Sequence, residues 1–449
     1  MIAEYGLALA MVASLIAGIF TGYPVAFVLA GVGVIFTFIG DVPLSYLGIV
    51  VNRIFSGVLS NWLLLAVPLF VFMGLMLEKA GTAKSLLLSL EKLFAGMRGG
   101  LAVSVALLGV IMAAATGIIG ASVVMLGLMA LPVMLQQGYS KTLAAGTVAA
   151  SGTLGILIPP SIMLVLVGDI LQIPVGDLFL AALLPGVVLG GLYVAFILIT
   201  ALVSPESAPP GALGSDEELP VLLQVLRDLI APVLLIAGVL GSIMAGYATP
   251  TEAAGIGAFG AVLLAALARR LTVQNFRESV EGTAVTSAMI IFVAIGATCF
   301  SAIFKRLGGD DMIEDAVYAI GAGPYGTLAV LMLLIFVLGF FLEWIEISYV
   351  VLPLFAPIVA ALDFGHGFTS QQTLVWFAIL VAINLQTSFL TPPFGYALFY
   401  LKGIAPPGLS MGDIYRSILP FVALQLIGLG LAVTFPGLVT WLPRVLIWN

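Results

Sequence analysis

Two stretches of the chain decide its fold: SGTLGILIPPS at residues 151–161 and NLQTSFLTPPFG at residues 384–395. Each lies in an apolar segment and contains two consecutive prolines, which remove backbone donors and disfavour the α-conformation of the preceding residue. We therefore expect a broken membrane helix at each site. Carbonyl groups left unpaired before the break suit Na⁺, and N–H groups left unpaired after it suit an anionic ligand group. The alternative is a simple kink that binds nothing.

The composition of the 449-residue chain indicates a membrane protein. Apolar residues make up 62% of it and charged residues 8%, whereas a soluble domain carries about 25% charged residues. The net charge of −7 argues against a nucleic-acid partner, which would require a basic surface. The single cysteine, Cys299, excludes an internal disulfide and a cysteine metal cluster. The single histidine, His366, is expected to be an ordinary polar residue in a loop.

The apolar segments predict an all-α, multi-pass protein, because a single strand cannot cross lipid and no alternating barrel pattern is present. A spanning helix needs roughly 20 apolar residues. The candidate spans are about 5–20, 24–40, 62–77, 142–168, 178–203, 229–246, 250–268, 286–304, 370–401 and 416–436. Two longer blocks, 100–140 and 325–362, are each either two full helices or a hairpin that enters and leaves on the same side.

The placement of Lys and Arg predicts the orientation of the chain. With the N-terminus outside, eleven of the 15 lie inside and four lie outside, namely Arg53, Lys305, Arg306 and Arg444. The first apolar run has no basic region before it, so we interpret it as a retained helix rather than a cleaved signal. The protein is thus expected in the lipid of a bacterial inner membrane, with a periplasmic N-terminus.

Landmarks recur along the chain at a nearly constant offset, which indicates an internal repeat. Pro24 and Pro250 are 226 residues apart, and the two Pro-Pro pairs are 233 apart. Lys79 is predicted inside and its counterpart Lys305 outside, so the two halves have opposite orientation. Inverted-topology repeats are typical of secondary transporters and provide alternating access. The predicted parts are the first repeat at 1–203, a cytoplasmic linker at 204–228 and the second repeat at 229–449.

Each long block has polar or charged residues near its centre, where a hairpin tip would lie. The first tip contributes Thr116, Gly117 and Ser122, with close packing of small residues between helices as the alternative. The second contributes Glu343 and Glu346. A carboxylate in a membrane segment costs roughly 2.5–3.5 kcal/mol, so it usually faces an ion, a partner or a cavity. The alternative is that this tip reaches solvent and both acids are hydrated.

The four breaks together predict one region that binds an anionic substrate and a coupling ion. The predicted substrate contacts are Gly152, Thr153, Ser161, Gln386, Thr387, Ser388 and Gly395. The predicted Na⁺ ligands are Thr116, Gly117, Ser122, Ser151, Gly155, Glu343, Glu346, Asn384 and Thr391. The breaks contain no Lys or Arg, so Na⁺ would supply the positive charge, and each ligand would favour binding of the other. Coupling to H⁺ through Glu343 or Glu346 is the alternative.

The sequence resembles the large (M) subunit of the tripartite ATP-independent periplasmic (TRAP) transporters over nearly its whole length. Besides the two Pro-Pro stretches, ATPTEAA at 248–254 carries the resemblance. It implies an elevator in which two re-entrant hairpins, at 100–140 and 325–362, and two broken helices, at 142–168 and 370–401, move against a scaffold. It also implies Na⁺-driven uptake, a separate four-helix membrane subunit of the Q type, and a periplasmic substrate-binding protein.

The chain departs from the family pattern at the predicted site. The first tip of the family usually reads Ser-Gly-Ser-Ser, where this chain has TGII at 116–119. The second tip usually has Asp at the position of Glu343, and Gln386, Thr387 and Ser388 replace a more apolar stretch. These departures change the expected substrate from the usual dicarboxylate to a small organic acid with one carboxylate, or a 2-oxo acid.

Other classes of protein fit the sequence less well. The main alternative is a stand-alone symporter for anions, driven by Na⁺ or H⁺ without a binding protein. An intramembrane protease would need paired aspartates, a Ser–His pair or metal-ligating histidines. The only histidine lies in a predicted loop, so we expect no enzyme. A channel would show ring-forming motifs, and a receptor would leave the paired Pro-Pro breaks unexplained.

Overall fold

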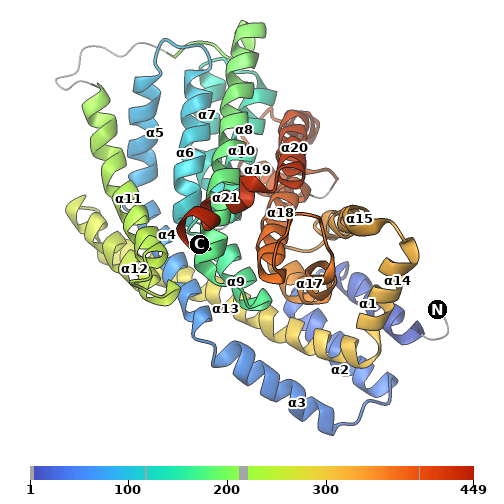
Figure 1. Cartoon of the computed structure of the whole chain (residues 1–449). Coiled ribbons are helices and arrows are strands. Elements are labelled where there is room, and N and C mark those ends of the chain that lie inside the picture. The colour runs from blue at the N-terminus through green and yellow to red at the C-terminus, as the bar shows by residue number, and fades with distance from the viewer. Residues whose placement is uncertain (1–4, 117–118, 212–220, 394, 449) are drawn as a thin grey trace.

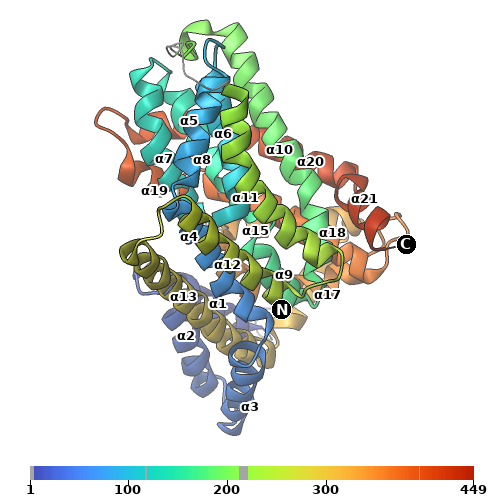
Figure 2. The same ribbon diagram turned by 90° about the vertical axis from the view of Figure 1, so that its left-hand side faces the viewer.

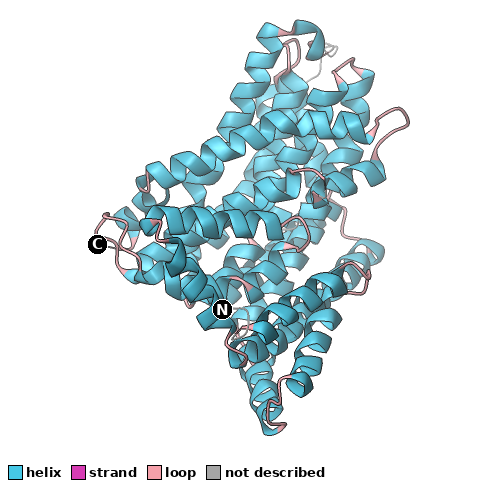
Figure 3. Cartoon of the chain, turned by 90° about the vertical axis from the view of Figure 1, so that its right-hand side faces the viewer, coloured by secondary structure: helices cyan, strands magenta, loops and turns pink. Residues whose placement is uncertain are grey.

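The computed structural model describes residues 5–116, 119–211, 221–393 and 395–448 (Figure 1). Within these ranges every regular element is a helix, and Figure 3 shows helices joined by loops without a strand. Six helices of the described chain are long and apolar enough to cross a membrane, or up to eight if each of two bent pairs forms one span. The predicted all-α, multi-pass class is confirmed.

The helices form two groups, each with members from both halves of the chain. Group A contains α1 (Gly6–Ile19), α2 (Val25–Ile39), α3 (Ser45–Ile54), α4 (Ala66–Lys79), α5 (Thr82–Leu93), α11 (Val221–Met244), α12 (Pro250–Leu267), α13 (Val273–Arg306) and α14 (Gly309–Ile320). Group B contains α6 (Gly100–Thr116), α7 (Ile119–Gln136), α8 (Lys141–Thr153), α9 (Ile162–Leu171), α10 (Val175–Val203), α15 (Gly323–Leu338), α16 (Trp344–Val350), α17 (Leu352–Ala361), α18 (Ser370–Leu390), α19 (Tyr396–Ile404), α20 (Met411–Thr434) and α21 (Gly437–Leu446).

The order of the helices agrees with the offset found in the sequence. Helix α5 begins at Thr82 and α14 at Gly309, 227 residues later, and their last residues, Leu93 and Ile320, are also 227 apart. In group A, helices of the first half pack on helices of the second half: α2 packs on α13, and α4 packs on α12 (Figures 1 and 2). That the repeats are inverted stays a prediction.

The two Pro-Pro pairs end helices where the sequence analysis expects them to. Helix α8 ends at Thr153, a 3₁₀ turn η3 (Leu154–Ile156) follows, and α9 begins only after Ser161. Helix α18 ends at Leu390, and α19 begins after Gly395. The block 100–140 forms α6 and α7, and the block 325–362 forms α15, α16 and α17, with a 58° bend between the last two. Their predicted re-entry into the membrane remains untested.

Two predicted boundaries differ from the structure because charged residues continue helices that the apolar windows cut short, and one helix was missed. Helix α13 begins at Val273 rather than near 286, with the Thr272 hydroxyl accepting from the Asn275 N–H at 3.0 Å. An i, i+4 pair between Arg277 and Glu281 at 2.7 Å supports its first turns. Helix α11 begins at Val221, so the predicted linker 204–228 overlaps it. Helix α3 was not predicted as a helix.

The segment of the first half that the predicted repeat aligns with α13 is bent. Helix α3 continues as a π-helical turn η1 (Phe55–Leu59), and a short 3₁₀ turn η2 (Leu63–Leu65) leads into α4. The segments Ser45–Leu59 and Leu63–Lys79 meet at 51°, so the predicted span 62–77 covers only the second piece. Asn61 lies at the bend, where its Oδ1 accepts from the Leu63 N–H at 2.9 Å.

Groups A and B contact each other through two kinds of surface. Helix α13 packs on α16, and α4 packs on α6 and α9. At the bend of the first half, the Asn61 amide donates to both carboxylate oxygens of Asp169 on α9, each at 2.8 Å. This polar contact joins an element of group A directly to the broken helix of group B.

Candidate substrate and ion site

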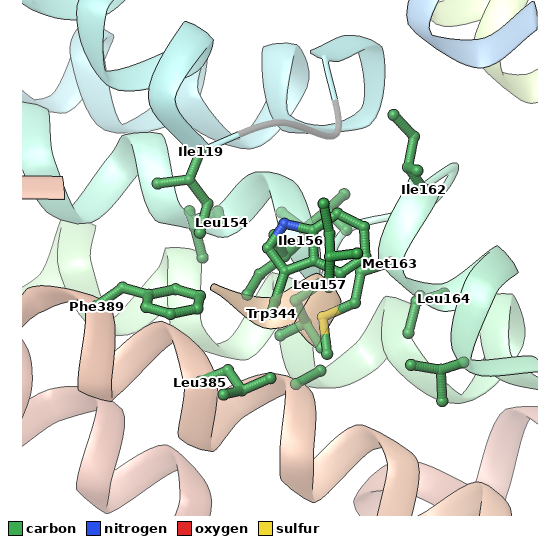
Figure 4. Packing of buried hydrophobic residues seen from close by; sticks show 14 of the residues in the cluster. Ile119, Leu154, Ile156, Leu157, Ile162, Met163, Leu164, Trp344, Leu385 and Phe389 are labelled. Atoms are coloured by element: carbon green, nitrogen blue, oxygen red, sulfur yellow. The ribbon is translucent and has the colours of Figure 1, made fainter. Parts of the chain in front are cut away.

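All four predicted breaks converge on one buried region of group B. In Figure 4, Ile119 at the start of α7 and Leu154 of η3 lie near Trp344 at the start of α16 and Phe389 near the end of α18. All four side chains are buried. Helix α18 also packs on α8, α9 and η3, so the two broken helices touch each other. The sequence therefore placed the breaks along the chain, and the fold brings them together.

Small residues of the first broken helix allow close approach of the first hairpin. A Cβ at Gly152 would lie 3.0 Å from the backbone of Val123 on α7, and a Cβ at Gly109 of α6 would lie 2.5 Å from the Cβ of Ser151. Gly152 was predicted to contact substrate, but it faces α7, which favours a packing role. Close contact holds the unpaired end of α8 in a fixed position between α6 and α7.

Besides Thr153, four predicted hydroxyls donate to backbone carbonyls. The Ser161 Oγ donates to Ile156 at 2.7 Å. The hydroxyls of Thr387, Ser388 and Thr391 donate within α18 to Ile383, Leu385 and Thr387 at 3.0, 3.0 and 2.7 Å. A hydroxyl that donates its proton in this way keeps its oxygen lone pairs. These oxygens can therefore still accept from a ligand or coordinate a cation.

The strongest indication of a binding site comes from two predicted residues that have no partner for their polar atoms. Within the described chain, Ser151 Oγ and both amide atoms of Gln386 form no hydrogen bond. Gln386 is fully buried, and Ser151 is nearly so. A buried polar group left without a partner costs roughly 1–3 kcal/mol. A ligand, an ion or ordered water that fills these positions would recover that free energy.

A buried network that the sequence analysis did not predict supports Thr153. The Gln425 amide of α20 donates to the Tyr193 hydroxyl of α10 at 2.8 Å and to Thr153 Oγ1 at 3.4 Å. The Thr153 hydroxyl itself donates to Ala150 at 2.8 Å. Gln425 Oε1 has no partner among the described residues. One glutamine in the otherwise apolar middle of α20 was the signal in the sequence that would have indicated this network.

The second hairpin places its two acids in different surroundings. Glu346, on α16, is only 5% exposed, and its Oε2 has no partner among the described residues. The alternative that both acids are hydrated at a solvent-exposed tip is therefore wrong for Glu346. Glu343, just before α16, is half-buried and within hydrogen-bonding reach of the Tyr400 hydroxyl of α19. The Tyr396 hydroxyl of α19 donates to the Phe341 carbonyl at 2.8 Å, which fixes α19 against this tip.

The remaining predicted residues have separate positions. The Asn384 amide donates to the Met332 carbonyl of α15 at 2.7 Å, so it joins α18 to the second hairpin. Ser122 and Gly155 are buried in α7 and η3, and Gly395 immediately precedes α19. Gly117 and the side chain of Thr116 lie outside the described residues.

Comparison with known proteins identifies the family. The family described as "Tripartite ATP-independent periplasmic transporter, DctM component" matches residues 12–438 of the chain. The chain belongs to this family. It is 28% identical to the C4-dicarboxylate TRAP transporter large permease protein DctM of Vibrio cholerae, over 88% of the chain and 89% of that protein. It is 29% identical to the ectoine large permease protein TeaC of Halomonas elongata, over 96% and 98%.

Two further likenesses concern chain organisation and fold. The isethionate permease protein DctMQ of Oleidesulfovibrio alaskensis is 28% identical over 86% of this chain, which matches only 58% of that longer protein. The crystal structure of the YdaH transporter of Alcanivorax borkumensis has a TM-score of 0.63 at 15% identity, over 88% of this chain and 90% of that chain. At this identity the likeness to YdaH concerns the fold alone. The DctM family members matched here are transporter permeases rather than enzymes.

Proposed function

We propose that this DctM component is the large membrane subunit of a Na⁺-driven, binding-protein-dependent importer of a small organic acid. The observation that supports this most is that each of the two broken helices, which touch each other, carries a fully or nearly buried side chain, Ser151 or Gln386, with polar atoms that have no partner within the described chain. Ser151 Oγ is an oxygen donor that suits a cation. The Gln386 amide has N–H groups that suit a carboxylate.

The helix ends at the two breaks would bind different ligands, one the ion and the other the substrate. Helix α8 ends at Thr153, so its last carbonyls and the Ser151 hydroxyl form a negative end for Na⁺. Helix α19 begins after Gly395, so its first N–H groups form a positive end for a carboxylate. Residues 151–161 and 384–395 contain no Lys or Arg. A substrate with one carboxylate, balanced by Na⁺, therefore fits better than one with two.

The substrate cannot be transferred from the relatives, because their names differ. The permeases compared above are named for C4-dicarboxylate, ectoine and isethionate, and a further relative in V. cholerae is named for sialic acid. Our proposal of a monocarboxylate or 2-oxo acid rests instead on the absence of Lys and Arg from residues 151–161 and 384–395, and on the polar side chains of Gln386, Thr387 and Ser388. The name DctMQ of the longer relative supports a partner of the Q type for this chain.

Transport would follow an elevator mechanism in which group B moves relative to group A. Both hairpins and both broken helices belong to group B, so the site would move as one packed unit. Group A interlocks the two halves through α2 on α13 and α4 on α12, which suits a static scaffold that the Q subunit extends. The Asn61–Asp169 contact joins the two groups and would have to open in each transport cycle.

Uptake by proteoliposomes tests this proposal. The chain is reconstituted with its small subunit, and labelled carboxylates are offered with and without a Na⁺ gradient and with and without the periplasmic binding protein. Uptake that requires both Na⁺ and the binding protein is the expected result. Uptake with an ion gradient alone would replace the proposal by a stand-alone symporter.

A second candidate is coupling to H⁺, which Glu346 favours. It is a buried carboxylate in a membrane segment, and its Oε2 has no partner among the described residues. Intramembrane carboxylates commonly serve proton relays. Uptake driven by a proton gradient in the absence of Na⁺ would support this candidate over Na⁺ coupling.

A further inference from the structure

A polar pocket of about 530 Å³ lies far along the chain from the substrate site, between α3 and the turn that joins α13 to α14. Its lining residues are Pro43, Ser45, Tyr46, Ile49, Arg53, Lys305, Arg306, Gly308 and Asp311. Four Lys and Arg residues are predicted on the outer side of the membrane, and three of them, Arg53, Lys305 and Arg306, line this pocket. The transport mechanism proposed above assigns no role to this cluster.

The charges of the pocket are unbalanced. Lys305 forms an ion pair with Asp310 at 3.3 Å, and Asp311 is the one acid among the lining residues. Among the described residues, neither Arg53 nor Arg306 forms an ion pair, and both side chains are exposed. Two guanidinium groups therefore face the pocket with their hydrogen-bonding capacity available. A guanidinium binds a phosphate through two parallel N–H donors.

One edge of the pocket is apolar. Ser45, Ile49 and Arg53 are spaced four residues apart, so they form one stripe along α3 that faces the pocket. Ile49 is about half exposed, and Pro43 also lines the pocket. Leu44, Val51 and Phe55, which are 62%, 64% and 60% exposed, share a different face of this segment, so they add apolar surface to the far side of α3 rather than to the pocket. Figures 1 and 2 show α3 at one end of the molecule, away from most of group B. Such a helix is typical of the membrane interface.

We propose that this pocket binds the headgroup of an anionic phospholipid. Its phosphate lies between Arg53, Arg306 and Lys305, and its acyl chains extend over Ile49 into the bilayer. The three cations favour a negatively charged ligand, and the apolar edge of the pocket favours a lipid over a free anion. Basic pockets between membrane helices bind anionic headgroups in this way. The site links α3 to the α13–α14 turn, so a bound lipid would hold the two halves of group A together at this end.

Lipid binding to the full chain in detergent tests the proposal. The probes are a short-chain phosphatidylglycerol, the matching phosphatidylcholine and inorganic phosphate, and the readout is the apparent Kd from the rise in melting temperature. The expected result is that phosphatidylglycerol raises the melting temperature, whereas phosphatidylcholine and phosphate do not. In the triple variant Arg53→Gln, Lys305→Gln, Arg306→Gln, its affinity should fall roughly 100-fold, since each cation near an anionic lipid contributes about fivefold.

Matched variants keep this test decisive. The triple variant Arg269→Gln, Arg270→Gln, Arg277→Gln also removes three cations, none of which lines the pocket, and should bind phosphatidylglycerol like the wild type. The single variants Arg53→Gln and Arg306→Gln, at exposed positions, each predict a fivefold loss and serve if the triple variant does not fold. Equal weakening in the control triple would overturn the proposal, as would equal stabilisation by phosphatidylcholine. Stabilisation by inorganic phosphate alone would assign the pocket to a free anion instead of a lipid.

Discussion

The two halves of the chain hold group B in different ways. In the first half, the bend between η1 and η2 brings Asn61 against Asp169, with two hydrogen bonds of 2.8 Å. In the second half the corresponding element is α13, a continuous helix that packs on α16, and Ser287, 226 residues after Asn61, lies buried within it. A pair of hydrogen bonds requires one geometry, whereas packed helix surfaces tolerate small shifts. Both halves thus pack on group B, since α4 packs on α6 and α9, and the first half adds a directional contact at its bend.

The halves also differ inside the candidate site. Thr153 and Gln386 are 233 residues apart, the offset of the two Pro-Pro pairs. The Thr153 hydroxyl donates to the Ala150 carbonyl and accepts from the Gln425 amide, whereas the Gln386 amide has no hydrogen-bond partner within the described chain. The ligand that satisfies Gln386 is therefore expected to depend more on the second half than on the first.

The largest expected effect comes from fixing the directional contact. In a Cys299→Ser background, Asn61→Cys and Asp169→Cys joined by a short bis-methanethiosulfonate linker should abolish uptake in proteoliposomes, because groups A and B could no longer separate there. A reductant should restore uptake. The control joins Lys79→Cys to Glu278→Cys, whose native side chains form an ion pair within group A, and should remain active. Undiminished uptake by the linked Asn61–Asp169 variant would show that this contact does not open during transport.

Gln386→Leu is expected to lower uptake about 100-fold. A hydrogen bond to a charged ligand contributes roughly 1.5–3 kcal/mol, and removal of an unpaired buried amide should leave the free energy of unfolding unchanged or higher. Thr153→Val should lower uptake only about tenfold, because its hydroxyl is already paired. Thr373→Val, at the other end of α18, is the control. Equal losses for Gln386→Leu and Thr153→Val would remove the difference between the halves.

Gln425→Leu is expected to lower uptake about tenfold, mainly through a higher KM, because the Gln425 amide donates to Thr153 and so positions it. Tyr193→Phe keeps the ring and removes one acceptor of the Gln425 amide, so a threefold effect is expected. The exposed Thr434→Val on the same helix serves as the control. A loss of stability without a change in KM would assign the network to packing alone.

Because the proposed Na⁺ position is the end of α8 with Ser151 rather than Glu346, Glu346→Gln is expected to have the smallest effect, within threefold on Na⁺-driven uptake. A neutral amide avoids the cost of burying a carboxylate with an unpaired oxygen, so the melting temperature should rise by a few degrees. Glu343→Gln, whose side chain is half-buried beside Tyr400, is the comparison. If Glu346→Gln instead abolishes uptake while the protein stays folded, H⁺ coupling through this residue replaces the Na⁺ proposal.

The sequence predicted the helix breaks well because their causes are local. Two consecutive prolines stop a helix whatever surrounds them, and α8 and α18 end before Pro159 and Pro392 as expected. The N-terminal turns of α13 were missed because Arg277, Glu278 and Glu281 fall outside an apolar window, although charged residues are good helix formers. Hydropathy identifies the part of a helix that contacts lipid, whereas the helix itself can continue beyond that part.

The composition of the site was less predictable, because it depends on contacts between distant segments. Ser151 and Gln386 were predicted, but nothing in the sequence indicated that they, rather than Thr387 or Ser161, would lack partners. Gln425 and Tyr400 lie far along the chain from the residues they contact, so only the fold reveals their roles. Gly152 illustrates a further role, because a residue predicted to contact substrate lies where two helices pack closely; its contact with substrate stays a prediction.

The length of α13 connects the protein to the thickness of its membrane. Its 34 residues span about 50 Å at 1.5 Å per residue, which exceeds the roughly 30 Å of the hydrocarbon layer. A continuous helix cannot shorten, so a thinner bilayer must be met by tilt of α13 or by local deformation of the lipid. Because α2, α4 and α16 all pack on this helix, a change in its tilt would move helices of both groups. The acyl-chain length of the host bilayer is therefore a physical variable that sets the relative position of the two groups.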